Sequence, residues 1–134
     1  MAIAVINPTT GATERTLEPH DSAEIERRVA AAHAAAQALR TASYAQRAEW
    51  MRAAADVLES EAEDVAVMIT REMGKPIAQS RAEAHKCVKN MRFYAEHAEA
   101  FLADEPLDDP SSVGASAAWA RYEPLGAVLA VMPW

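Results

Sequence analysis

Apolar residues recur every three or four positions between residues 21 and 103, a spacing that is typical of amphipathic helices. Asp21 and Glu24 have the spacing of a capping box, which predicts a helix that begins after Asp21. Its apolar stripe consists of Ile25, Val29, Ala32, Ala36 and Leu39. Because this stripe is mostly alanine, we expect the helix to approach a neighbouring element closely.

A second helical segment is indicated by Ser43, which lies three residues before Gln46 and can cap a helix N-terminus. The apolar stripe of this segment contains Trp50, Met51, Ala54, Val57 and Leu58. The helical pattern continues over residues 61–73, and the sequence leaves open whether the helix breaks near Ser60.

Gly74 follows this region and is predicted to end the helix as a C-terminal cap in the left-handed conformation. Pro76 suits the first turn of the next helix, where its missing N–H group would be unpaired anyway. Apolar residues at helical spacing predict that this helix runs to about Leu102.

Short β-compatible segments lie at both ends of the chain. Residues 2–6 and 13–17 flank a turn-forming sequence at residues 7–11, which predicts a surface hairpin. Residues 104–112 contain two prolines and three aspartates and predict an exposed connection. Residues 117–123 alternate in side-chain character and predict a strand with at least one exposed face.

The five consecutive apolar residues 128–132 predict a strand that is buried on both faces. Such strands belong to parallel sheets covered by helices, so the predicted fold class is α/β. Pro133 cannot donate a ladder hydrogen bond and should end the strand. Ligands of α/β sheets bind beyond the carboxyl ends of the strands, and Trp134 lies at that point. We therefore interpret the chain as the front of a larger enzyme.

Charge and composition exclude several classes of function. The formal net charge of −7 argues against a nucleic-acid partner, because phosphates require a basic surface. No apolar run approaches the roughly 20 residues that span a bilayer, and no secretory signal is visible. The single cysteine allows no internal disulfide and favours a cytoplasmic location.

Few residues are candidates for chemistry. Cys87 lies next to Val88 in the predicted last helix, and we interpret it as a packed structural thiol. Glu72 and Lys75 could form an acid–base pair, but a solvated helix end is the preferred interpretation. The sequence contains no glycine-rich phosphate-binding motif. No metal-ligand spacing is found among His20, His33, His85 and His97.

Four motifs in order and in register resemble the aldehyde dehydrogenase superfamily over the whole length of the chain. They are Asn7-Pro8 with Gly11, Glu72-Met73-Gly74-Lys75-Pro76, Pro124-Leu125-Gly126 and Met132-Pro133-Trp134. Residues 113–118 and 127–134 are similar to the NADP-dependent bacterial succinate-semialdehyde dehydrogenases within it. The resemblance implies a homo-oligomeric oxidoreductase that converts an aldehyde, best matched by succinate semialdehyde, to the acid with NADP or NAD.

The resemblance also divides the chain, all of which it places in a partial cofactor-binding domain. Residues 1–20 are then the N-terminal hairpin, 21–103 a helical region, 104–123 a connection and an arm strand that joins subunits, and 124–134 the first strand of the cofactor domain. The residues implied to lie along the dinucleotide are Val131, Met132, Pro133 and Trp134.

No catalytic residue is assigned to this chain by the resemblance. In the family a cysteine thiolate adds to the aldehyde, oxyanion donors stabilise the developing charge, and hydride passes to nicotinamide. The nucleophile and the glutamate base are expected further along, and Cys87 does not match the nucleophile's motif. The 134-residue chain alone should therefore be inactive. The alternative is a helical interaction module without chemistry, or an inactive truncated product.

Overall fold

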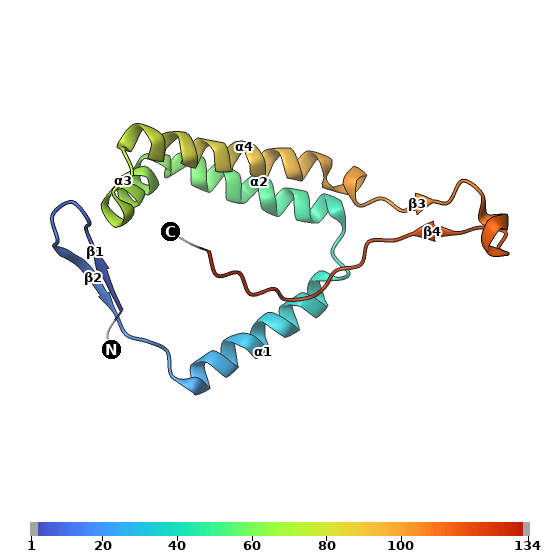
Figure 1. The fold of residues 1–134 in the computed structure, drawn as a ribbon, viewed down its shortest axis with the longest axis horizontal. Coiled ribbons are helices and arrows are strands. Elements are labelled where there is room, and N and C mark those ends of the chain that lie inside the picture. Colours follow the sequence, from blue (N-terminus) through green and yellow to red (C-terminus); the bar gives the residue numbers. More distant parts are fainter. Residues whose placement is uncertain (1–2, 133–134) are drawn as a thin grey trace.

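The computed structural model describes residues 3–132, which form a small hairpin, four helices and a projecting arm (Figure 1). Strands β1 (Ile3–Ile6) and β2 (Thr13–Leu17) pair antiparallel, with Ile3 opposite Leu17. The side chain of Asn7 accepts a hydrogen bond from the Thr9 N–H at 2.9 Å, which closes the turn between them. The predicted N-terminal hairpin is confirmed.

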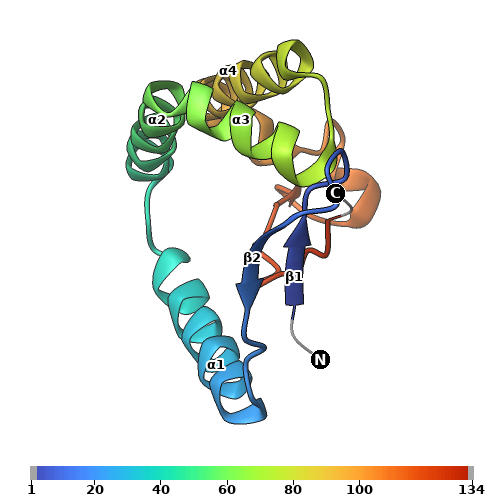
Figure 2. The same cartoon turned by 90° about the vertical axis from the view of Figure 1, so that its left-hand side faces the viewer.

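Helix α1 (Ser22–Leu39) begins as predicted, because the Asp21 carboxylate accepts the Glu24 N–H at 2.8 Å. Its packing differs from the prediction. Figures 1 and 2 show α1 standing apart from the other helices, and none of its residues is buried. The expected close approach of its alanine stripe is wrong for residues 3–132, because no other element there covers that face.

Three helices pack together and form the core. They are α2 (Tyr44–Ser60), α3 (Ala62–Met73) and α4 (Ile77–Phe101), with α4 lying along both of the others. Glu61 leaves helical geometry with φ −102° and ψ 8°, so the helix does break after Ser60. The buried apolar residues are Ala55, Ala62, Ala66, Ile69, Ala84 and Val88. Because most of them are small, the helix backbones can approach closely.

The ends of these helices agree with the predicted local signals. The Ser43 hydroxyl accepts the Gln46 N–H at 3.1 Å at the start of α2. Gly74 has φ 74° and ψ 13°, and its N–H donates to the Thr70 carbonyl at 2.9 Å, so α3 ends with the predicted left-handed cap. Helix α4 begins after Pro76 and ends one residue before Leu102, as expected.

Polar contacts fasten α4 to its neighbours. The buried Ser80 hydroxyl lies 3.0 Å from the Thr70 hydroxyl, so the polar atom inside the bundle has a partner. On the surface, Arg92 donates to Asp56 at 2.8 Å and to Glu59 at 2.7 Å, which joins α4 to α2. Such exposed pairs contribute little individually, so the small apolar core provides most of the packing.

The arm projects away from the helices (Figure 1). Strand β3 (Glu105–Pro106) pairs antiparallel with β4 (Trp119–Ala120), and the 3-10 helix η1 (Pro110–Val113) lies between them. The predicted exposed strand is present but only two residues long. Residues 104–112 are exposed except for the half-buried Pro110, as predicted for an exposed connection, and they also contain β3 and most of η1.

Residues 124–132 form no strand and are exposed, which corrects the prediction of a buried parallel strand at 128–132. This segment runs between α1 and the helical bundle (Figure 1). A strand requires a neighbour to receive its backbone hydrogen bonds, and none of residues 3–132 pairs with it. The α/β class is confirmed by the two small sheets and the helices. No helix in the described part of the chain is long and apolar enough to cross a membrane.

Candidate functional site

Two of the four predicted cofactor-binding residues lie in the exposed terminal segment. The side chains of Val131 and Met132 are 85% and 79% exposed, and Pro133 and Trp134 lie outside the described residues. The unpaired backbone of this segment can lie along an extended ligand. The part of a dinucleotide that needs charged or backbone donors is its pyrophosphate, and the sequence contains no glycine-rich turn for it.

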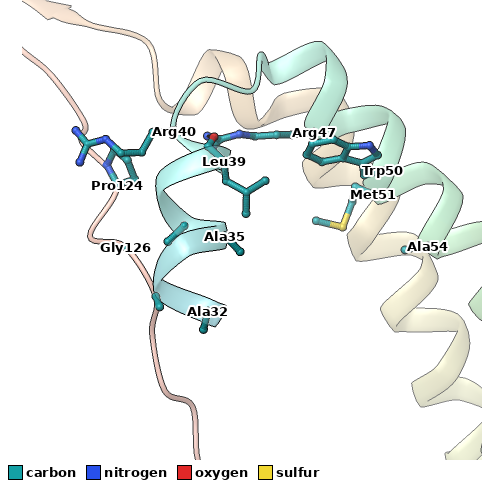
Figure 3. A pocket seen from close by; sticks show the side chains of 12 residues that line it. Ala32, Ala35, Leu39, Arg40, Arg47, Trp50, Met51, Ala54, Pro124 and Gly126 are labelled. Carbon is teal, nitrogen blue, oxygen red and sulfur yellow. The ribbon is translucent and has the colours of Figure 1, made fainter. Parts of the chain in front are cut away.

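An apolar cavity of about 580 Å³ lies between α1, α2 and the terminal segment (Figure 3). Leu39, Trp50 and Met51 are its large apolar side chains, alanines of α1 and α2 form much of the remaining wall, and Arg40 and Arg47 also line it. Pro124 and Gly126 close the opposite side. No cysteine, histidine or carboxylate lines this cavity, so its walls can bury apolar surface but carry no acid, base or nucleophile.

Arg47 fixes the corner between α1 and α2 at the top of this cavity (Figure 3). Its Nη2 donates to the Leu39 carbonyl at 2.6 Å, which satisfies one of the free carbonyls at the end of α1. Its guanidinium also lies 5.9 Å from the centre of the Tyr44 ring. The buried Arg47 Nε has no hydrogen-bond partner among the described residues. Arg47 therefore links the end of α1 to the first turn of α2.

Two of the motifs that define the resemblance meet in space. A Cβ at Gly74 would lie 3.1 Å from Pro8 Cγ, so the hairpin turn rests directly on the end of α3. Arg15 of β2 lies 3.7 Å from Glu72 of α3, and Lys75 pairs with Glu83 instead. Glu72 and Lys75 therefore have different partners, and their side chains are only 21% and 24% exposed, so this helix end is less solvated than predicted.

Cys87 is exposed, which corrects the interpretation of a packed thiol. The buried stripe of α4 consists of Ser80, Ala84 and Val88, which recur every four residues. Adjacent residues of a helix point about 100° apart, so Cys87 faces away from the stripe that buries Val88. Its side chain lines a shallow hollow of about 540 Å³ together with Lys75, Ala82, Glu83, Lys86 and Asn90. The sequence analysis did not predict this hollow, although Lys86 and Lys89 on either side of Cys87 were a signal of positive charge there.

Charged groups brace the arm. Arg121 donates to Asp104 through Nε at 2.9 Å and through Nη2 at 2.5 Å, and this holds the pKa of the Asp104 carboxyl below its usual range. The Arg121 guanidinium also lies 5.8 Å from the Trp119 ring centre. The Tyr122 hydroxyl donates to Glu105 at 2.5 Å, which raises the pKa of Tyr122. These contacts stiffen a projection whose Trp119 side chain is 53% exposed.

Metal chemistry has no support among the described residues. Residues 3–132 contain no group of three histidine, cysteine or carboxylate side chains that could hold an ion. His97 instead stacks on Phe93, with ring centres 4.3 Å apart.

Two curated relatives can be aligned with the whole length of this chain. It is 54% identical over 134 residues to "Succinate-semialdehyde dehydrogenase [NADP(+)] 1" of Mycobacterium tuberculosis (strain ATCC 25618 / H37Rv) and 51% identical to "Succinate-semialdehyde dehydrogenase [NADP(+)]" of Mycobacterium leprae (strain TN). In both cases the match includes 100% of this chain and 29% of the relative. The chain therefore spans less than a third of the length of these curated relatives.

Solved structures have the same arrangement of elements. Gox0499, whose structure concerns cofactor and substrate selection, matches with a TM-score of 0.85 at 30% identity, over 93% of this chain and 27% of that chain. The succinate-semialdehyde dehydrogenase from Burkholderia pseudomallei matches with a TM-score of 0.74 at 28% identity, over 84% and 23%. The pattern of the aldehyde dehydrogenase family matches all of residues 1–134. With its hairpin, helices and arm in the same order, this chain belongs to the aldehyde dehydrogenase family.

Proposed function

We propose that the whole protein containing this chain oxidises succinate semialdehyde to succinate, with NADP as the preferred cofactor and NAD as the alternative. The observation that carries this proposal is the 54% identity with a mycobacterial enzyme named for that substrate and cofactor, extending over all 134 residues. Because the sequence identity extends over the hairpin, the helices and the arm, it supports the proposal that the two proteins build their active sites on the same framework.

In this proposal the terminal segment of the chain contributes to cofactor binding. Val131, Met132, Pro133 and Trp134 would lie along the dinucleotide, which supplies the hydride acceptor when it is bound. Val131 and Met132 are exposed and their backbone is unpaired, so they are free to join a sheet and to border a ligand. The phosphate-binding groups, the nucleophile and the base would come from other parts of the whole protein.

The arm would contact a second subunit, which makes the whole protein a homo-oligomer. Its support is the projection of β3 and β4 away from the helices and the exposure of Trp119 at its surface. Exposed aromatic residues on a braced strand pair are typical of surfaces that become buried on association. The single cysteine supports a reducing cytoplasm as the location.

An assay of the whole protein tests the proposed reaction. NADP reduction is followed with succinate semialdehyde and, separately, with butanal, and the series is repeated with NAD. We expect faster reduction with succinate semialdehyde and NADP than with any other pair. Absence of reduction with every aldehyde would refute the proposed function, whereas faster reduction with NAD would change only the cofactor.

A further inference from the structure

The central turns of α4 carry a concentration of positive charge in an acidic protein. Between Glu83 and Glu96 the helix contains Lys86, Lys89 and Arg92 and no carboxylate, although the chain has a net charge of −7. The charge of Arg92 is balanced by Asp56 and Glu59 across the bundle, and that of Lys75 is balanced by Glu83. No carboxylate of residues 3–132 pairs with Lys86.

Lys86 borders the hollow of about 540 Å³ on the face of α4 that points away from the buried stripe. Asn90 lies one helical turn further along, so its amide and the Lys86 ammonium are on the same side of the helix. Cys87 is the exposed thiol at the border of this hollow. An unpaired ammonium beside an amide N–H can donate two hydrogen bonds to one carboxylate.

A second surface hollow on α4 provides a comparison. It is lined by Arg52, Asp56, Arg92 and Glu96, which are two cations and two carboxylates, so its charges cancel. The hollow at Lys86 contains two lysines and one carboxylate, and Glu83 already pairs with Lys75. One positive charge is therefore left for a ligand at the Lys86 hollow, and none is left at the other.

The hollow lies in the N-terminal half of α4, near the end of the bundle where α3 passes into α4. In Figures 1 and 2 the residues that lead to Met132 return toward this same end of the bundle. The segment that we propose to lie along the cofactor therefore approaches the part of the molecule that contains the hollow.

We propose that the Lys86 hollow recognises the carboxylate of an anionic aldehyde substrate, with Lys86 as the charge and Asn90 as a second donor. This inference rests on the proposed function, because it assigns a binding site to the carboxylate of succinate semialdehyde, the end of the substrate that does not react. Charge-assisted hydrogen bonds favour an anionic substrate over a neutral one of the same length. Lys86 and Asn90 would set substrate specificity and take no part in the chemical step.

Steady-state kinetics of the whole protein test the proposal with succinate semialdehyde and with butanal, which has the same carbon chain without the carboxylate. Lys86→Gln should raise KM for succinate semialdehyde about tenfold, the scale of one charged hydrogen bond, and should leave both KM for butanal and kcat nearly unchanged. Lys86→Arg should retain most of the affinity. Lys89→Gln is the matched control, since it removes the same charge three residues away and outside the hollow.

Equal changes for the two aldehydes, no change in Lys86→Gln, or the same change in Lys89→Gln would each overturn the proposal. The two proposals also fail in different ways. An unaltered protein that oxidises no aldehyde refutes the proposed function and this inference together. An active protein in which Lys86→Gln changes KM equally for the two aldehydes refutes only the inference.

Cys87 provides a binding measurement that is independent of activity. Succinate should slow the alkylation of Cys87 by iodoacetamide, measured by peptide mass spectrometry, and Lys86→Gln should abolish this protection. Protection by inorganic phosphate but not by succinate would overturn the assignment to a carboxylate. A thiol in the whole protein that iodoacetamide cannot reach would also overturn the proposal, because the hollow would then be closed to substrate.

Discussion

Replacing Gly74 by alanine should destabilise the protein for two separable reasons. The first is the backbone, since φ of 74° places Gly74 in the left-handed region, where a residue with a Cβ loses about 1–2 kcal/mol. The second is the contact with the hairpin, because the new Cβ would lie 3.1 Å from Pro8 Cγ. Carbon atoms normally approach to about 3.5–4.0 Å, so Pro8 and its turn would have to move.

The sum of these effects can be worked out from the structure. Overpacking typically destabilises by about 1–3 kcal/mol, and the exposed hairpin can shift, which favours the lower limit. We therefore expect the Gly74→Ala substitution to lower the free energy of unfolding of the whole protein by about 2–3 kcal/mol. Gly11→Ala is the matched control, because Gly11 has φ 72° but a Cβ there would meet no atom within 4 Å.

A double-mutant cycle separates the two contributions. Urea unfolding, followed by circular dichroism, is measured for Gly74→Ala, Pro8→Ala and the double variant. In the Pro8→Ala background, Gly74→Ala should lose only the backbone part, close to the value for Gly11→Ala. Additivity of the two substitutions would show that the hairpin contact contributes nothing. An unchanged stability in Gly74→Ala would refute the argument from the left-handed backbone as well.

Three further predictions concern the arm, the terminal segment and the start of α1. Trp119→Glu should shift the whole protein toward smaller species, because it places a charge in the proposed subunit contact; an unchanged mass by light scattering would contradict this. The 134-residue chain alone should not oxidise succinate semialdehyde, and micromolar NADP should not quench the fluorescence of Trp134, with Trp134→Phe as the control. Turnover above a protein-free blank, or quenching that disappears in Trp134→Phe, would contradict this prediction. Hydrogen bonds from Arg27 and Arg28 lower the pKa of Glu24 from 4.5 to about 2. The stabilisation of α1 by these hydrogen bonds is therefore fully present above pH 4.5 and is lost as the pH falls toward 2. In a circular-dichroism titration, Glu24→Gln should remove that part of the acid transition, and an identical transition in both proteins would refute it.

Much of the local structure could be predicted from short stretches of sequence. Asp21 and Ser43 cap helices by bonding to an N–H three residues later, and Gly74 ends a helix because it tolerates positive φ. The hairpin likewise follows from the turn formers after Asn7. In each case the deciding interaction joins residues only a few positions apart, so neighbouring side chains carry the information.

Only the tertiary structure decided which faces are covered. The alanine stripe of α1 and the apolar residues 128–132 have the patterns of buried elements, yet both are exposed, because burial depends on a partner that a periodic pattern cannot specify. Cys87 was likewise predicted to be packed and is exposed, because a single helical step turns it away from the face that buries Val88. The same holds for Pro8 on Gly74 and for the hollow at Lys86, which bring together residues from different elements or successive turns. Their geometry is set by the packing of the helices, to which many weak contacts far apart in the chain contribute together.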